Sequence, residues 1–143
     1  MIQTCTELLQ AYRQRRRVLK AEKLTFLGIS GRDVYNIAAP ICVGGEWFIP
    51  ARVEPRETEY SEVMFFRQAG SAWVLAEDIP FLSLQDPFWV RIHGEVILGG
   101  VEVFPHPTKQ GALGWRTKFY RGQDLTSLRH FASGPDGMKD IRL

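Results

Sequence analysis

Residues 85–102 read QDPFWVRIHGEVILGGVE, and this stretch decides the fold. Two apolar runs, 88–92 and 96–98, flank His93-Gly94, a pair of residues typical of a tight turn between strands. The pattern predicts an antiparallel β-hairpin that leads into Gly100-Val101-Glu102.

A second stretch of the same design lies earlier, at 36–54, and reads NIAAPICVGGEWFIPARVE. The offset between the two stretches is 47 residues at Pro40 and Pro87, and 48 residues at the Val-Glu pairs. A period near 50 residues with about four strands per unit is typical of the blades of a β-propeller. Two unrelated hairpins in an ordinary sheet are the alternative interpretation.

The repeat predicts an all-β fold in which 24–143 forms an incomplete β-propeller of about two to two and a half blades. Blade 1 is expected over about 34–78, blade 2 over about 86–132, and the start of a third blade over about 138–143. Each complete blade is expected to be a four-stranded antiparallel sheet. Since a propeller removes its open edges only as a full ring, we expect a truncated chain or a homo-oligomer that pairs through the blade edges.

The N-terminal segment, 1–23, predicts one basic α-helix. Thr4-Cys5-Thr6-Glu7 fits a capping box, and apolar residues recur at helical spacing from Leu8 onward, so the helix is expected over about 4–22. The segment is rich in arginine, although the formal net charge of the whole chain is only +2. A solvated helix face is the favoured interpretation, and contact with RNA or an anionic membrane is the alternative.

The composition is that of an ordinary folded domain, with 143 residues, 45% hydrophobic and 24% charged. Cys5 and Cys42 stand far apart and are expected to be free thiols in a reducing compartment. No apolar run reaches the roughly 18 residues of a membrane span, and the histidines show no metal-ligand spacing. We therefore expect a cytoplasmic protein with no cofactor, no metal, and no nucleic-acid or membrane partner.

Carboxylates and tryptophans are the residues of greatest chemical interest. Several acids lie at the ends of expected strands or in the turns beside them, where successive propeller blades would bring them to a central channel: Asp33, Glu54, Asp86, Glu102, Asp136 and Asp140. Paired carboxylates are the groups that glycoside chemistry uses, one to protonate the departing oxygen and one to activate the attacking group. The four tryptophans are expected to pack between blades rather than to serve as sugar platforms.

The two repeats, together with the C-terminal stretch GPDGMKDIRL at 134–143, resemble a largely uncharacterised family with a five-bladed β-propeller of the glycosyl hydrolase type. More distantly they are similar to β-mannoside phosphorylases and hydrolases. The resemblance runs from about residue 24 to the end and corresponds to the N-terminal half of that family. It implies a five-bladed propeller that is incomplete here, with carbohydrate as the ligand.

The resemblance also implies a set of site residues. Asp86 lies where the mannoside phosphorylases have a catalytic Asp within Glu-Asp-Pro-Arg, the general acid, although Gln85 and Phe88 depart from that motif. The positions assigned to substrate binding are Asn36, Arg52, Glu54, Glu102, Lys139 and Asp140. We expect the first three and Asp86 to lie on one side of the sheets, at the channel-facing ends of inner strands. An ion pair between Arg52 and Glu54, and a simple strand-end role for Asn36, are the structural alternatives.

Two functions follow as expectations. In its full-length form the protein is expected to be a glycosidase-like propeller that binds or processes β-mannoside-type carbohydrate. The alternative is a catalytically inactive truncated fragment or an interaction module. Inorganic phosphate is disfavoured as a partner because the phosphate-binding basic residues of later blades are absent from this sequence.

Overall fold

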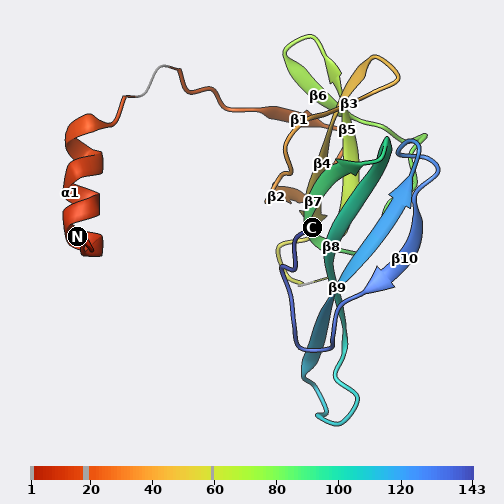
Figure 1. Cartoon of the computed structure of the whole chain (residues 1–143). Helices are drawn as coiled ribbons and strands as arrows, with labels where there is room; N and C mark the ends of the chain where they lie inside the picture. The colour runs from red at the N-terminus through yellow and green to blue at the C-terminus, as the bar shows by residue number, and fades with distance from the viewer. Residues whose placement is uncertain (1, 18–19, 59) are drawn as a thin grey trace.

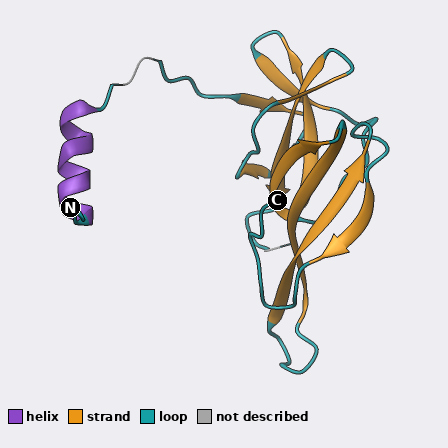
Figure 2. Cartoon of the chain, viewed as in Figure 1, coloured by secondary structure: helices purple, strands orange, loops and turns teal. Residues whose placement is uncertain are grey.

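The computed structural model describes residues 2–17, 20–58 and 60–143, and this part of the chain contains one helix and ten strands (Figure 1). The elements follow one another as α1(Cys5–Arg15), β1(Thr25–Leu27), β2(Asp33–Tyr35), β3(Ile41–Val43), β4(Glu46–Glu54), β5(Glu62–Ala69), β6(Ala72–Leu75), β7(Gln85–Ile92), β8(Glu95–Pro105), β9(Leu113–Gly122) and β10(Arg129–Ser133). From Thr25 onward the regular structure is entirely strand (Figure 2). A mostly β chain with one N-terminal helix is thereby confirmed.

The first sheet has six strands, in the order β1-β6-β5-β4-β2, with β3 also paired to β4. Gly44 and Gly45, with φ of 60° and 85°, form the two-residue turn that joins β3 to β4 and sets the pairing of Val43 with Glu46. Within the range expected for blade 1, β2 to β6 pair antiparallel, and these are five strands where four were expected. Outside that range, β1 pairs with β6 in parallel and covers the open edge of β6.

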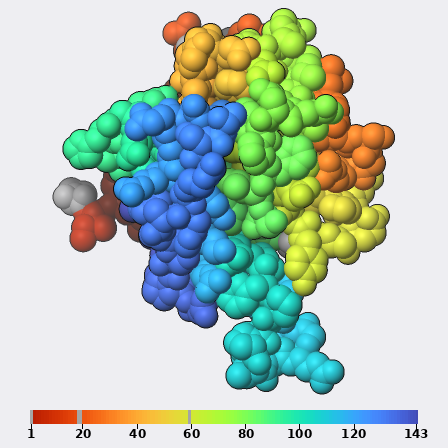
Figure 3. Space-filling view, turned by 90° about the vertical axis from the view of Figure 1, so that its right-hand side faces the viewer, coloured from red at the N-terminus to blue at the C-terminus, as the bar shows by residue number. Residues whose placement is uncertain are grey.

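The second sheet is antiparallel throughout, in the order β10-β9-β8-β7. His93 and Gly94, both with positive φ, form the expected two-residue turn between β7 and β8. Strands β8 and β9 pair without interruption from Val96–Gly122 to Pro105–Leu113, so they form a long twisted ribbon. Figure 3 shows the segment joining them projecting from the lower end of the molecule.

Strand β5 is buried on both of its faces. Val63, Met64, Phe65 and Phe66 are each 0% exposed. Val63 and Phe65 belong to the core between the two sheets, which also contains residues of β7–β8 and the loops beside them: Leu84, Val96, Leu98, Leu125 and Leu128. Met64 and Phe66 face the other way, into a second cluster that β1 and β2 help to cover. This double burial joins the two sheets into one structure.

The division of the chain into blades stays a prediction. The second sheet spans 85–133, against about 86–132 expected for blade 2, and 138–143 forms no strand. The described residues include no helix long and apolar enough to cross a membrane. Both cysteines are free and exposed, as expected.

Helix α1 begins as expected and ends earlier. Thr4 and Glu7 form the capping box, with the Thr4 N–H donating to Glu7 Oε2 at 2.7 Å. The helix ends at Arg15, and Arg16 is already extended, so the expected end near residue 22 was wrong; positions 18–19 lie outside the described residues. None of its residues is buried, and a short helix without tertiary packing is marginal in water. Repulsion between Arg13 and the arginines three and four positions later opposes its extension.

We expect Phe65→Ala to lower the free energy of unfolding by about 3–5 kcal/mol, because it opens a cavity at the centre of the core between the sheets. Phe131→Ala is the matched control, since that ring on β10 is 43% exposed and its loss should cost less than about 1 kcal/mol. Urea denaturation of both variants measures the difference. Equal losses would contradict the assigned core.

Candidate functional site

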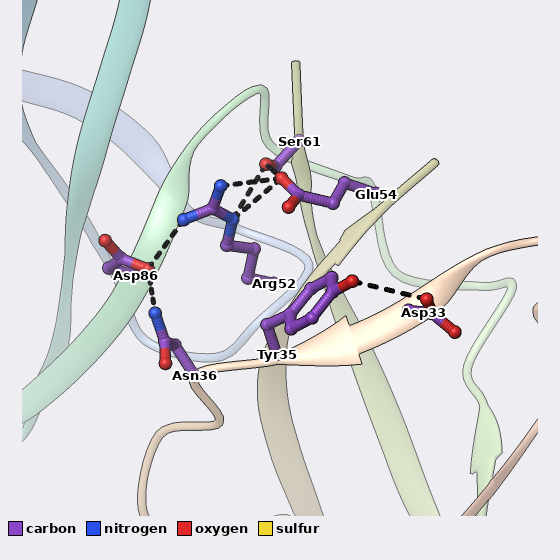
Figure 4. Close-up of polar contacts among 7 residues, drawn as sticks. All are labelled: Asp33, Tyr35, Asn36, Arg52, Glu54, Ser61 and Asp86. Carbon is purple, nitrogen blue, oxygen red and sulfur yellow. Dashed lines mark hydrogen bonds and ion pairs between the residues drawn. The ribbon is translucent and has the colours of Figure 1, made fainter. Parts of the chain in front are cut away.

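Arg52 is the centre of a polar cluster that links the two sheets (Figure 4). Its guanidinium lies on β4 and pairs with Glu54 of the same strand, Nη2 to Oε2, at 2.7 Å. On the other side Nη1 lies 3.2 Å from Oδ1 of Asp86, at the start of β7. Asn36 Nδ2 donates to that same oxygen at 2.6 Å. We call these residues, with Ser61, the Arg52 cluster.

Strand alternation explains why these side chains meet. Arg52 and Glu54 are two positions apart on β4, so they share one face of the strand, the face toward β7. Asp86 reaches them because the register of β7 against β8 shifts between Gln85 and Phe88. Pro87 lies within that irregularity, where a residue without an N–H is tolerated. The bulge therefore turns Asp86 toward the first sheet.

The backbone at the cluster is strained. Asn36, Asp86 and Asp140 have φ of 36°, 49° and 60°, values that a residue with a side chain seldom adopts. All three line one polar hollow of about 350 Å³, together with Arg142. Asn and Asp tolerate this conformation best among residues with a side chain. Strained backbone of this kind gathers at functional sites, and here three instances surround one hollow.

The cluster is only partly open to solvent. The side chains of Arg52 and Glu54 are 12% and 13% exposed, and that of Asp86 is 21% exposed. Burial opposes the charged form of Arg52, but its hydrogen bonds and charge interactions with Glu54 and Asp86 outweigh burial and raise its pKa. Arg52 therefore carries a permanent charge between two carboxylates.

The remaining expected site residues lie outside this cluster. Glu102 on β8 pairs with Lys118 at 2.6 Å and Arg116 at 2.7 Å, both on β9, so its ion pairs stay within the second sheet. Burial alone would raise the pKa of Glu102, but the hydrogen bonds from Lys118 and Arg116 hold it below its usual range. Lys139 lines a separate hollow of about 200 Å³ beside Gln85. Asp140 lines the hollow of Asp86 and pairs with Arg142 at 3.9 Å.

Sequence reasoning missed two residues of this region. Ser61, which is buried, accepts a hydrogen bond from Arg52 Nε at 2.9 Å and donates one to Glu54. Arg142 places its guanidinium carbon 4.0 Å from the ring centroid of Phe88, on the hollow that Asp86 lines. Arg142 lies in the stretch 134–143 that carries the family resemblance, but no role was assigned to it or to Ser61, because both contacts depend on how distant parts of the chain come together. In the described ranges, no group of three His, Cys, Asp or Glu residues could hold a metal ion.

A family model described as "Protein of unknown function (DUF1861)" matches residues 10–143. Among curated proteins none matches. The chain is 36% identical to a solved GDP-Man-dependent mannosyltransferase from Leishmania mexicana, covering 97% of this chain and 45% of that one, with a TM-score of 0.86. It is 32% identical to a mannose phosphorylase from Leishmania mexicana solved in complex with phosphate ion, covering 96% and 42% of the two chains, with a TM-score of 0.83.

A hypothetical protein from Leishmania major is also similar, at 32% identity and a TM-score of 0.80, over 95% of this chain and 44% of that one. The chain thus spans less than half the length of each of these three structures.

We expect Arg52→Ala to destabilise the fold by about 3 kcal/mol, because it leaves two poorly hydrated carboxylates facing one another without a cation. Arg56→Ala is the matched control: Arg56 pairs with Asp33, but its side chain is 76% exposed, so its loss should cost less than about 1 kcal/mol. Chemical denaturation distinguishes the two. A loss in Arg52→Ala no larger than the control would contradict the cluster as a link between the sheets.

Glu102 should make stability depend on pH. Its pKa in the folded chain lies below the ordinary value of 4.5, so its contribution is complete above that pH and is lost as pH falls through the lowered folded value. The gap in unfolding free energy between the wild type and Glu102→Gln should therefore be wide near about pH 6 and narrow near about pH 3. The exposed Glu77→Gln should show no such change in its gap. A constant gap for Glu102→Gln would be evidence against these ion pairs.

Proposed function

The chain belongs to the DUF1861 family, and we propose that it binds carbohydrate at the Arg52 cluster and forms part of a protein that processes a β-mannoside-type substrate. The observation that carries this proposal is that Asn36 and Arg52 both contact Asp86, and that Asn36 and Asp86, each with strained backbone, line one polar hollow. The similarity to a mannosyltransferase and a mannose phosphorylase supports the choice of sugar.

The cluster has the properties that sugar recognition requires. A planar guanidinium and a carboxylate held by mutual hydrogen bonds are pre-oriented donors and acceptors for hydroxyl groups. The hollow of about 350 Å³ is within the size range of small-molecule sites, which begins near about 300 Å³. Because Arg52 and Asp86 are partly buried, their bonds to a ligand would be weakly screened by solvent.

We propose Asp86 as the general acid, as the resemblance to the phosphorylases implies. Both donors, Arg52 Nη1 and Asn36 Nδ2, meet its Oδ1, and Figure 4 shows its second oxygen pointing away from them. A proton on that second oxygen would pass to the glycosidic oxygen as the bond to the sugar breaks. The carboxylate formed in this step would be stabilised at Oδ1 by Arg52 and Asn36.

Phe88 occupies the position at which the related motif has an arginine. The placement of Arg142 supports a role for it as the substitute for that arginine. Its guanidinium stacks on the Phe88 ring at 4.0 Å and lines the hollow with Asp86. We propose that Arg142 supplies the bidentate donor that position 88 lacks. The departure from the motif would then leave the charge of the hollow unchanged.

We further propose that the two sheets are the first two blades of a five-bladed propeller and that 138–143 opens a third. The group that opposes Asp86 would come from the part of the solved relatives that this chain does not span. The chain of 143 residues would then bind sugar without turning it over. A binding measurement is therefore the appropriate test.

We expect the ¹⁵N-labelled chain to bind methyl β-D-mannopyranoside with a Kd of about 1 mM, the affinity usual for a ligand of this size. Asp86→Asn and Arg52→Lys should each weaken binding by about tenfold or more, because the first removes a charged acceptor and the second removes the planar guanidinium with its several N–H donors. Asp78→Asn is the matched control, since Asp78 forms a comparable pair with Arg67 at 2.9 Å outside the cluster. Binding that survives in the first two variants, or no binding by the wild type, would refute the proposed site.

A further inference from the structure

A second cavity, of about 520 Å³, lies at the base of the projecting end of the β8–β9 ribbon (Figure 3). Its walls are mainly apolar, from Phe104, Leu113 and Trp115, and polar groups stand at its edge, from His106, Lys109 and Asp136. We propose that this cavity, which we call the Trp115 cavity, binds a second pyranose unit of the saccharide that the Arg52 cluster binds. The inference rests on the proposed function and extends it to the length of the ligand.

Trp115 is a rigid, exposed aromatic surface. Its indole Nε1 donates to the Gly137 carbonyl at 3.0 Å, so the polar edge is satisfied and the ring is fixed in place. The side chain is nevertheless 41% exposed, whereas Trp73 in the core is 8% exposed. The expectation that all four tryptophans pack between blades was therefore wrong for Trp115, and for Trp47, which is also exposed.

The rest of the cavity is fixed as well. Arg116 lies over the Phe104 ring at 5.0 Å, and a Cβ at Gly114 would come within 2.6 Å of that ring, so Gly114 lets Phe104 pack closely. His106 Nδ1 accepts a hydrogen bond from the Thr108 N–H at 3.2 Å, which leaves Nε2 as the donor of a neutral ring. A donor at His106 and an acceptor at Asp136 therefore stand beside an aromatic wall.

This combination matches the chemistry of a pyranose. One face of the sugar ring carries C–H groups with partial positive charge, which are attracted to the negative face of an indole. Its rim carries hydroxyl groups that need both donors and acceptors. The cavity size is within the range of small-molecule sites.

A surface hollow extends from the Trp115 cavity toward the first site. This hollow, of about 200 Å³, shares Leu113 and Trp115 with the cavity and is also lined by Lys139 and by Gln85, the neighbour of Asp86. Arg116 links the edge of the cavity to Glu102, with Asp136 at 3.3 Å and Glu102 at 2.7 Å. One extended saccharide could therefore contact both sites. Lys139, which lies outside the Arg52 cluster, would then lie beside the bound saccharide.

The test compares the binding of methyl β-D-mannopyranoside with that of a β-linked mannotriose. Two quantities are measured for each sugar: its Kd, and the shift of the indole N–H signal of Trp115, which is assigned with Trp115→Phe. The trisaccharide should shift the Trp115 signal and bind about tenfold more tightly than the monosaccharide. Trp115→Ala should remove that gain and leave the Kd of the monosaccharide unchanged. Trp47→Ala, at another exposed tryptophan, is the matched control and should keep the gain.

Each other result has one meaning. Equal affinities for the two sugars, or a gain that persists in Trp115→Ala, overturn the second subsite. Monosaccharide binding that Arg52→Lys does not weaken overturns the proposed function alone, while a gain lost in Trp115→Ala still supports the cavity. A chain that binds neither sugar contradicts both proposals. A shift of the Trp115 signal by N-acetyl-leucine amide, but by neither sugar, would assign the cavity to an apolar protein segment instead and overturn the inference.

Discussion

The guanidinium of Arg52 is a charged connection between two sheets that also meet through apolar side chains and through hydrogen bonds from Trp89 and Arg91 of β7 to the carbonyls of Ala39 and Cys42. It lies on β4, and it fixes Glu54 on its own strand and Asp86 at the start of β7. Removing these charges from water is costly, and the cost is offset only because each charged group finds opposite charge and hydrogen bonds nearby. Arg52 therefore helps to fix the position of β7 relative to β4, and with it the position of Asp86 on the hollow.

The strained backbone lies just after the end of β2 and at the start of β7. Asn36 and Asp86 adopt left-handed backbone conformations, and each then directs a polar side chain to the same point. Next to them Phe88 lies against Gly99, where any Cβ would come within 2.1 Å of its ring, so the ring is tightly held. Arg142 stacks on that ring. A rigid apolar support thus holds a charged group beside Asp86, and the doubly buried β5 supplies the stability that such strain requires.

Local signals predicted the local structure well. The glycines of the Gly44-Gly45 and His93-Gly94 turns predicted both hairpins, because two-residue turns of this kind need positive φ. The internal repeat, with the family resemblance, also selected Asn36, Arg52, Glu54 and Asp86, and the structure brings these four into direct contact. The sequence did not predict contacts between segments that are distant in sequence. The parallel pairing of β1 with β6 depends on where a chain segment is placed after the sheet forms, and no turn or periodicity encodes it.

Contacts between distant segments also explain the other features that were not predicted from the sequence. Ser61 and Arg142 reach the site through loops that fold back, so nothing in the adjacent residues distinguishes them. The helix was expected to be too long because helical spacing was read without the packing that sustains a helix, and α1 buries no residue. Trp115 is held at the surface by the hydrogen bond from its indole N–H to Gly137, a contact made by a loop 22 residues away in sequence.

The most direct measurement uses the fact that Asn36 is the one asparagine in the sequence. Its side-chain amide, labelled with ¹⁵N, gives a single pair of NMR signals from the centre of the Arg52 cluster. If the cluster binds sugar, titration with methyl β-D-mannopyranoside should shift these signals along the same curve as the binding measured calorimetrically, and Asp86→Ala, which adds no second asparagine, should abolish the shift. Signals that stay unchanged while calorimetry reports saturation would place the sugar elsewhere and contradict the account.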